Sequence, residues 1–243
     1  MTYLKRRSQL AGYAIMLGLM APWTVATAGV FSVTPVRLYM APRDRAVAVT
    51  LRNEGDTPVV LQADINVWSQ KPDGTDELVL TDDLILAPPI IKLAPKAQQV
   101  VRLALLKPAD ASRQLTYRMI IREVPEAQPA PGVEVQIALA LSMPVFITPP
   151  TAKRQMNCST QRGDDKTVNL QCSNTGTAYG QIREATLARN GQTMARFEGG
   201  SYILPGASKT ISLKGDKSVS AGDAQLVITF DDGQTLTSSV MLP

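Results

Sequence analysis

Residues 132–146 read GVEVQIALALSMPVF, and the interpretation of the whole chain depends on this stretch. Apolar side chains occupy every second position along it, namely Val133, Val135, Ile137, Leu139, Leu141 and Met143. The alternate positions are mostly small or polar, so the pattern predicts a strand with one apolar face, longer than the usual strand of about five or six residues. Two interpretations are open: the six side chains line the core of a β-sandwich, or they form an apolar row for a second chain.

The rest of the chain also alternates in short segments that are separated by turn residues. Before residue 149 we expect strands over residues 31–40, 46–52, 59–69, 84–93, 100–105, 117–123 and 132–146. Beyond residue 150 we expect strands over residues 168–172, 181–189, 195–197, 210–213, 225–230 and 235–241. No helical periodicity occurs after the first 28 residues, so the pattern predicts an all-β protein.

Prolines restrict where these strands can lie in a sheet. Pro35 lies inside the segment 31–40, and a proline favours an edge strand or a strand that switches sheets. The Pro88-Pro89 pair excludes a central strand around it for the same reason.

A second proline pair, Pro149-Pro150, predicts a stiff boundary in the chain. On each side of it the expected strands suffice for one sandwich. We therefore expect two domains, over residues 29–148 and 151–243, with a cleft at their junction.

Residues 1–28 have the composition of a signal peptide. Basic residues at 5–7 precede an apolar stretch at 10–23, and small residues follow at 26–28. The apolar stretch is too short to span a membrane, so we expect an exported, soluble protein. Without this leader, which holds three basic residues and no acid, the formal net charge falls from +4 to +1. That charge gives no reason to expect a nucleic-acid partner.

The two cysteines, Cys158 and Cys172, lie fourteen residues apart on either side of a turn-like cluster. In an exported protein such a pair most simply forms a disulfide, and the spacing suits neighbouring strands of one hairpin. A free reactive thiol or a metal pair is the alternative, but two cysteines without histidine make a poor metal site.

The sequence contains no histidine, which removes the usual catalytic base and the imidazole metal ligand. Three acidic pairs could in principle act as glycosidase carboxylates: Asp82-Asp83, Asp164-Asp165 and Asp231-Asp232. Each pair lies in a turn-like context, where aspartate caps the backbone. The loop at 73–77 lacks the complete ligand pattern of a calcium site. We therefore expect no enzyme, with no catalytic residue, no metal and no cofactor.

Three arginines lie within otherwise apolar strands, where a guanidinium is costly to bury without a partner. For Arg122 we expect an internal ion pair with Glu123 or another carboxylate. For Arg37 and Arg118 no neighbouring acid is evident in the sequence. These two arginines would suit a carboxylate that a partner brings into a cleft.

Several segments together resemble the periplasmic pilus-assembly chaperones of the chaperone–usher pathway, the PapD-like proteins. The segments are SVTPVR (32–37), TLRNEGDTPVVLQADINVW (50–68), LILAPPIIKLAPKAQQVVRL (84–103), YRMIIREVP (117–125) and VQIALALSMPVFITP (135–149). The resemblance is most specific in the first expected domain, and the last domain matches in layout only.

The resemblance implies two immunoglobulin-like sandwiches set in a boomerang, in the periplasm. It also implies that the long strand is lent to a pilus subunit, whose core it completes. In that case Val135, Ile137 and Leu139 are the donor side chains, and Val133, Leu141 and Met143 extend the row. The implied partners are pilus subunits and an outer-membrane usher. An uncovered apolar edge also predicts self-association of the free chaperone.

The family holds the terminal carboxylate of the subunit with an arginine on the first strand and a lysine late on the donor strand. Arg37 matches the arginine, but the lysine position falls on Pro144, which suggests a non-classical branch. Arg118 is our candidate for the second anchor, because its strand should lie beside the donor strand. An exported adhesin or carbohydrate-binding sandwich is the alternative function, but it would need exposed aromatic residues.

Overall fold

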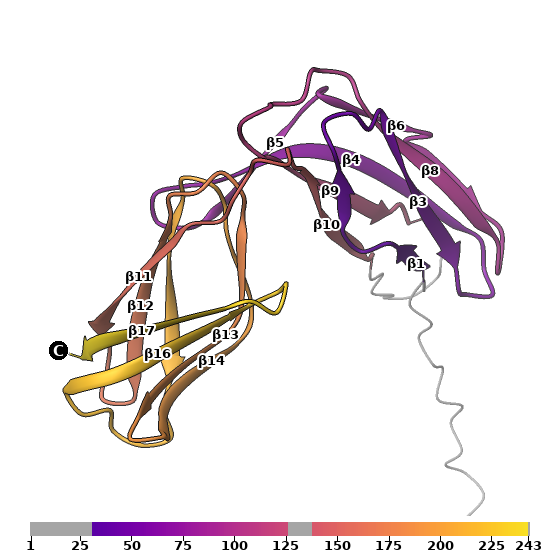
Figure 1. Ribbon diagram of the computed structural model, residues 1–243. Helices are drawn as coiled ribbons and strands as arrows, with labels where there is room; N and C mark the ends of the chain where they lie inside the picture. The colour runs from indigo at the N-terminus through magenta and orange to yellow at the C-terminus, as the bar shows by residue number, and fades with distance from the viewer. Residues whose placement is uncertain (1–30, 126–137, 243) are drawn as a thin grey trace, which may run out of the picture.

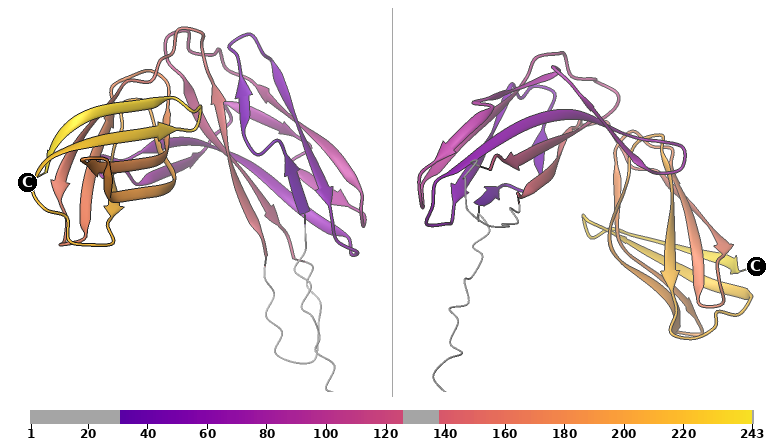
Figure 2. Two further views of the ribbon diagram at one scale, coloured as in Figure 1. Left: turned by 60° about the horizontal axis from the view of Figure 1, so that its bottom comes forward. Right: turned by 180° about the vertical axis from the view of Figure 1, so that it is seen from behind.

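The computed structural model describes residues 31–125 and 138–242, which form two β-sandwich lobes set at an angle to each other (Figure 1, Figure 2). Within these ranges the chain contains strands and turns and no helix. It follows that no helix of the described chain is long and apolar enough to cross a membrane. The predicted all-β fold, with two sandwiches in a boomerang arrangement, is confirmed.

The first lobe is built from the strands that precede residue 148. They are β1 (Phe31–Thr34), β2 (Leu38–Met40), β3 (Ala46–Asn53), β4 (Val59–Gln70), β5 (Asp76–Leu80), β6 (Leu84–Ala87), β7 (Ile90–Leu93), β8 (Gln98–Leu105), β9 (Leu115–Glu123) and β10 (Ala140–Ile147). One sheet has the order β1-β3-β8-β6, and the other has the order β2-β10-β9-β4-β5, with β7 also paired to β4. The two sheets pack face to face.

Two segments of this lobe switch from one sheet to the other at a proline. The predicted strand over 31–40 divides at Pro35 into β1 and β2, which belong to different sheets. Pro88 and Pro89 divide the segment over 84–93 into β6 and β7 in the same way. Proline has no N–H to donate to a sheet ladder, so a crossing point accommodates it well.

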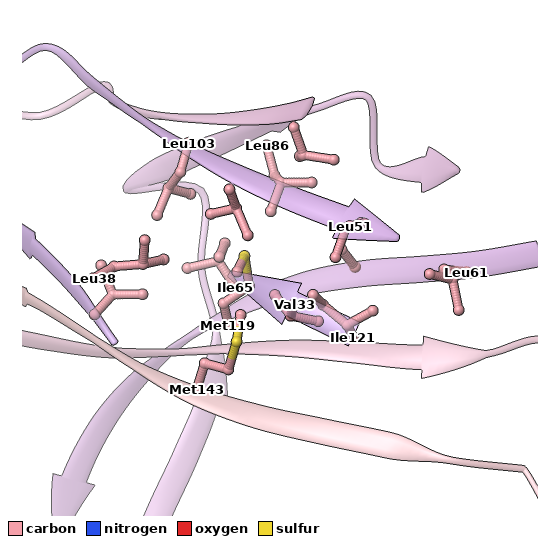
Figure 3. Close-up of a cluster of buried hydrophobic side chains, with 14 of the residues drawn as sticks. Val33, Leu38, Leu51, Leu61, Ile65, Leu86, Leu103, Met119, Ile121 and Met143 are labelled. Atoms are coloured by element: carbon pink, nitrogen blue, oxygen red, sulfur yellow. The ribbon is translucent and has the colours of Figure 1, made fainter. Parts of the chain in front are cut away.

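The core of the first lobe lies between its two sheets (Figure 3). Val33 and Leu51 enter it from one sheet, and Ile65 and Met119 enter it from the other. The period-two alternation of these strands explains the arrangement, because every second side chain points to the same face. Burying each large apolar side chain contributes about 1.5–3 kcal/mol to the stability of the lobe.

The second lobe contains the remaining strands. They are β11 (Met156–Arg162), β12 (Thr167–Asn174), β13 (Gly180–Arg189), β14 (Gln192–Ile203), β15 (Ser208–Lys214), β16 (Gly222–Phe230) and β17 (Thr235–Leu242). Their order is β11-β12-β15-β14-β13-β16-β17, but β14 and β15 pair only at Arg196 and Lys214. The strands on the two sides of this weak seam enclose a separate core, to which Leu170 and Leu187 belong.

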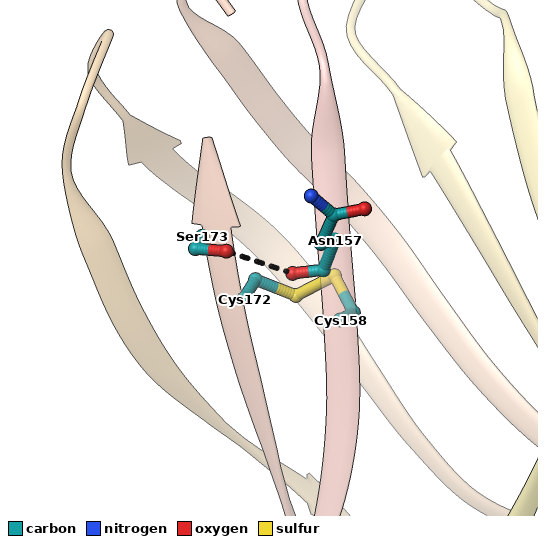
Figure 4. The surroundings of a disulfide bond; sticks show 4 residues. All are labelled: Asn157, Cys158, Cys172 and Ser173. Atoms are coloured by element: carbon teal, nitrogen blue, oxygen red, sulfur yellow. Dashed lines mark hydrogen bonds between the residues drawn. A yellow bond between two sulfur atoms is a disulfide. The ribbon is translucent and has the colours of Figure 1, made fainter. Parts of the chain in front are cut away.

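The predicted disulfide joins two neighbouring strands of the second lobe (Figure 4). Cys158 on β11 lies directly opposite Cys172 on β12 in the antiparallel register. The next residues are also linked, because the Ser173 hydroxyl donates to the Asn157 carbonyl over 3.5 Å. The hairpin interpretation of the cysteine spacing is therefore confirmed.

Candidate functional site

Strand β10 has one paired side and one partly open side. Along one side it pairs antiparallel with β9, from Ala140 opposite Arg122 to Ile147 opposite Leu115. On its other side it pairs with β2, in parallel, over residues 145–147 only. Among the residues that the structure describes, this second side has no strand partner over residues 140–144. Such an open edge can accept a strand from another chain.

The apolar row predicted from the sequence emerges from the core along β10. Met143 is only 4% exposed and lies beside Met119 in the core of the first lobe (Figure 3). Leu141 is partly buried against the same core, whereas Leu139 is 40% exposed. The assignment of Met143 to a row offered to a partner is therefore corrected, because the opposite sheet covers its side chain. The other members of the row, Val133, Val135 and Ile137, lie outside the described residues.

The opposite face of the same sheet carries an aromatic cluster that joins the two lobes. Trp68 on β4 and Phe146 on β10 are buried against Leu204 of the second lobe. The Phe146 ring stacks on Tyr179 with 4.0 Å between ring centroids, and Tyr202 meets the Trp68 ring at 5.1 Å. Aromatic pairs of this kind contribute about 0.5–1.5 kcal/mol each beyond the area that they bury.

Two glutamine side chains add directional contacts between the lobes. The Gln70 amide donates to the Tyr202 carbonyl over 2.9 Å and accepts from the Leu204 N–H over 3.0 Å. The Gln114 side-chain oxygen accepts from the Tyr179 N–H over 2.9 Å. These bonds satisfy backbone groups of the second lobe and restrict the angle at which the lobes meet.

Arg37, which lies between β1 and β2, is held by the second lobe. Its Nη1 donates to Asp231 Oδ2 over 2.6 Å, and its Nη2 donates to Gln181 Oε1 over 2.5 Å. The Tyr179 hydroxyl donates to the same aspartate oxygen over 2.9 Å. Burial by itself lowers the pKa of Arg37, but hydrogen bonding to Tyr39 and the nearby charges, Asp231 included, outweigh it and raise the pKa. The guanidinium therefore stays charged.

This contact gives Arg37 a neighbouring acid that is not evident in the sequence. Asp231 is 194 positions away in the chain and belongs to the acidic pair that we interpreted as a turn. The turn itself is present between β16 and β17, where the Asp232 carboxylate accepts from the Gln234 N–H. Nothing in the sequence distinguishes Asp231 from a solvated turn residue, so only the docking of the lobes reveals its partner.

Arg118 lies on β9 opposite Pro144 of β10, as the predicted adjacency of their strands requires. Its Cζ is 3.7 Å from the centroid of the Trp68 ring, and the Asp76 carboxylate is 4.0 Å from its Nη2. Burial lowers the pKa of Arg118, and Asp76 opposes this effect only in part. The Arg118 guanidinium therefore stacks on the Trp68 ring but has only a weak ion pair, with Asp76.

The structure brings both predicted anchor arginines to one aromatic ring. The Cζ atoms of Arg37 and Arg118 lie 5.6 Å and 5.4 Å from the centroid of Tyr202. The Asn66 amide and the Trp68 indole N–H are buried nearby, and within the described chain neither donor has a partner. Donors therefore outnumber acceptors around Arg118, which favours an acceptor such as a carboxylate.

Arg122 and two aspartates of the acidic pairs have structural partners. Arg122 pairs with Asp64, so the expected internal ion pair is present, with an acid other than Glu123. Asp232 pairs with Arg154 over 3.2 Å, and Asp83 pairs with Lys107. These partners account for both acids without a catalytic role.

A hollow of about 700 Å³ lies at the junction of the lobes. Tyr39 and Gln114 of the first lobe and Tyr179 and Asp231 of the second are among the residues that line it. In the described part of the chain no three cysteine, aspartate or glutamate side chains gather as metal ligands. The hollow supplies polar side chains next to the Arg37 contact.

A family profile and solved structures identify what this arrangement resembles. The profile described as "Pili and flagellar-assembly chaperone, PapD N-terminal domain" matches residues 30–153. The chaperone–tip adhesion subunit complex CsuC–CsuE of Acinetobacter baumannii gives a TM-score of 0.66 at 17% identity, covering 88% of this chain and 100% of that chain. The SafB chaperone, solved with the SafA pilin of Salmonella enterica, gives 0.57 at 16% identity, with 89% and 97% covered. No curated protein sequence matches the chain.

The two angled sandwiches thus have the fold of the pilus-assembly chaperones. The matched profile spans 124 of the 243 residues, and the chain belongs to the family of pili and flagellar-assembly chaperones. This is a family of periplasmic chaperones that are not enzymes. The resemblance inferred from the sequence motifs is confirmed.

Proposed function

We propose that this protein captures pilus subunits in the periplasm by lending them strand β10 and then delivers them to an outer-membrane usher. Family membership supports the chaperone role. Two structural neighbours, CsuC and SafB, were solved with a tip adhesion subunit and with a pilin, which supports subunits as the clients. The proposal includes export by the leader at 1–28 and a division into domains at 29–148 and 151–243.

The single observation that carries the proposal is the open edge of β10 beside an apolar row that leaves the core. On the side away from β9, residues 140–144 of the described chain offer backbone polar groups without a strand partner. Leu139 presents an apolar side chain at the end of this edge. A subunit that lacks a strand could pair with the edge and bury the row, which is β-strand addition.

Arg37 and Arg118 are the proposed anchors for the terminal carboxylate of the subunit. Both guanidinium groups lie within 6 Å of the Tyr202 ring, so one carboxylate group near this ring is within reach of both. The unpartnered donors of Asn66 and Trp68 favour the same ligand chemistry. Removing one partner of a buried charge pair typically costs about 2–5 kcal/mol of binding free energy.

The alternative of an adhesin or carbohydrate-binding protein has little support in the described chain. Such a site needs an exposed aromatic platform, whereas Trp68 and Phe146 are almost fully buried between the lobes. Tyr39 is exposed, but its hydroxyl lies 2.9 Å from that of Tyr179 within the junction.

Co-expression with subunits from neighbouring genes tests the proposal. Leu139→Asp should abolish co-purification of the subunit, because a charge would enter the groove that the row fills. The melting temperature should change by no more than a few degrees, since Leu139 is exposed. The same change at Ile137 should have the same effect on capture.

Leu106→Asp is the matched control, because Leu106 is also an exposed leucine of the first lobe but follows β8, which belongs to the other sheet. It should capture subunit normally. If the Leu139 variant still brings down a stoichiometric amount of subunit, β10 is not the donor strand. If the variant simply unfolds, the side chain belongs to the core of the chaperone.

A further inference from the structure

Asp231 occupies the position at Arg37 that an incoming carboxylate would take. Its carboxylate accepts a charge-assisted hydrogen bond from Arg37 Nη1 over 2.6 Å. The aspartate side chain is 10% exposed, and the arginine side chain is 28% exposed. The acid is therefore sheltered inside the junction, and the arginine is the accessible partner.

We propose that Asp231 competes with the terminal carboxylate of the subunit for Arg37. Asp231 holds Arg37 in the free chaperone, and the subunit carboxylate displaces Asp231 on capture. This inference rests on the proposed function, because it concerns the same anchor. The second lobe then does more than form a wall of the cleft: it sets the apparent affinity of the anchor for its ligand.

Charge balance favours competition over simple support of Arg37. An arginine carries five N–H donors, and Asp231 and Gln181 use only two of them. Spare donors remain for another acceptor, but the single positive charge is already balanced by Asp231. A second carboxylate at Arg37 would face repulsion from Asp231 unless that acid gave way.

An exchange of partners would leave each of the two charged groups with at least one hydrogen-bond partner. When Asp231 releases Arg37 it retains the Tyr179 hydroxyl, which donates to the same oxygen over 2.9 Å. Arg37 in turn retains Gln181 and gains the carboxylate of the subunit. Abandoning a buried charge is strongly unfavourable, so an exchange that keeps both charges solvated by partners is far easier than a simple rupture.

The location of Asp231 also suits movement. The residue lies in the turn between β16 and β17, outside the paired ladder of those strands. The backbone N–H of Asp231 donates to the Gln181 carbonyl over 3.0 Å, so the carboxylate would withdraw by rotation of the side chain, with this bond kept. The Tyr39 hydroxyl, 2.9 Å from that of Tyr179, gives Tyr179 a first-lobe contact that does not depend on Arg37.

The expected loss of affinity for the subunit carboxylate depends on the fraction of free molecules in which Asp231 holds Arg37. If Asp231 holds Arg37 in about 90–99% of free molecules, the apparent affinity of the anchor falls about 10- to 100-fold, because only the remaining fraction can bind. Removing the competitor should recover that factor.

A competition between chaperone variants for limiting subunit tests the inference. Wild-type and Asp231→Asn chains with different tags are co-expressed with one subunit from neighbouring genes, and the ratio of the two complexes is measured. Asparagine keeps the shape and removes the charge, so the variant should win by about tenfold. The advantage should vanish with a subunit whose C-terminus is extended by several residues, which removes the carboxylate from its place.

Asp232→Asn is the matched control, because Asp232 lies in the same turn and pairs with Arg154 rather than with Arg37. It should compete equally with the wild type. A loss of capture by Asp231→Asn would mean that the acid positions Arg37, and an unchanged ratio would mean that it is a bystander. Either result overturns the inference.

Tyr179→Phe provides a second variant in case Asp231→Asn is poorly folded. It removes the hydroxyl that Asp231 needs after the exchange, so capture should weaken several-fold, and this loss should disappear in the Asp231→Asn background. Normal capture by the Tyr179 variant would contradict the exchange.

Arg37→Ala separates failure of the inference from failure of the proposed function. If this variant captures subunit as well as the wild type, the carboxylate anchor itself is wrong. If it loses capture while Asp231→Asn gains nothing, the anchor stands and only the competition fails.

Discussion

The two halves of β10 belong to one strand but have opposite environments. Residues 143–147 are buried, with Met143 and Val145 in the core of the first lobe and Phe146 in the aromatic cluster between the lobes. Toward its other end the strand is open on one side, and Leu139 is exposed. Apolar side chains recur at every second position through both halves, although every residue of 143–147 is apolar. A repeated pattern therefore records which face is apolar, and the neighbouring elements decide whether that face is core or binding surface.

The largest effect is expected in the buried half. Phe146→Ala removes a ring that touches Trp68, Tyr179 and Tyr202, and it should lower the free energy of unfolding by about 3–5 kcal/mol. Urea denaturation measures this change. If the loss were below about 1 kcal/mol, the two halves would not differ in the way that we describe.

A substitution that destabilises the protein far from β10 tests whether capture of the subunit depends on stability alone. Replacing Cys158 and Cys172 together by serine should destabilise the second lobe by about 3 kcal/mol in the chain-entropy model of a loop of this size. At a temperature where the variant is still folded, it should capture subunit normally, unlike Leu139→Asp. Titration of free thiols in the denatured wild type provides the control, and two reactive thiols per chain would contradict the disulfide.

The anchor arginines should affect capture more than folding. Arg37→Ala should weaken capture at least tenfold, or about 1.4 kcal/mol, with a similar loss for Arg118→Ala. The double variant should lose less than the sum if both groups hold one carboxylate. Lysine should restore little at either position, because an ammonium lacks the planar fork. Normal capture by Arg118→Ala alone would place the second anchor elsewhere.

The smallest effect is expected at Tyr117, a core residue on β9 whose hydroxyl donates to Asp83 over 3.0 Å. Burial raises the pKa of Tyr117 from 10.0 to about 12, so the folded state retains the phenol proton longer than the unfolded state. Its contribution to stability is complete below pH 10 and is lost as the pH rises toward 12. Tyr117→Phe should cost about 1 kcal/mol at neutral pH and should lose less stability than the wild type between pH 10 and 12.

Capture by the Tyr117 variant should be unchanged, because the side chain points into the core. Thermal melts at pH 7, 10 and 12 measure the stability effect. An equal alkaline loss in wild type and variant would assign the effect to other tyrosines.

Strands that bury one face were the predictable part of this molecule. The segments around β4 and β9 alternate clearly, and both strands extend over their predicted ranges. By contrast, β5 and β11 were not predicted. Every residue of β5 is exposed, and β11 is mostly polar, so neither strand shows the apolar alternation that signals a strand.

The candidate site divides in the same way. Motifs in the sequence were sufficient to single out Arg37, and the strand adjacency of Arg118 could be inferred from the order of the elements. The contacts that surround Arg37 and Arg118 could not be inferred from the sequence. Arg37 is paired with Asp231 and Arg118 is stacked on Trp68, and these contacts arise only after the strands and lobes have packed.

The sequence alone determined the all-β class, the disulfide and the family, because alternation, cysteine spacing and short motifs are local properties of the chain. The tertiary structure alone decided that Met143 is core and Leu139 is surface, and that Asp231 faces Arg37. The physical reason is that burial and charge pairing depend on contacts between residues far apart in the chain, here 194 positions for Arg37 and Asp231. Such contacts exist only where two sheets or two lobes meet.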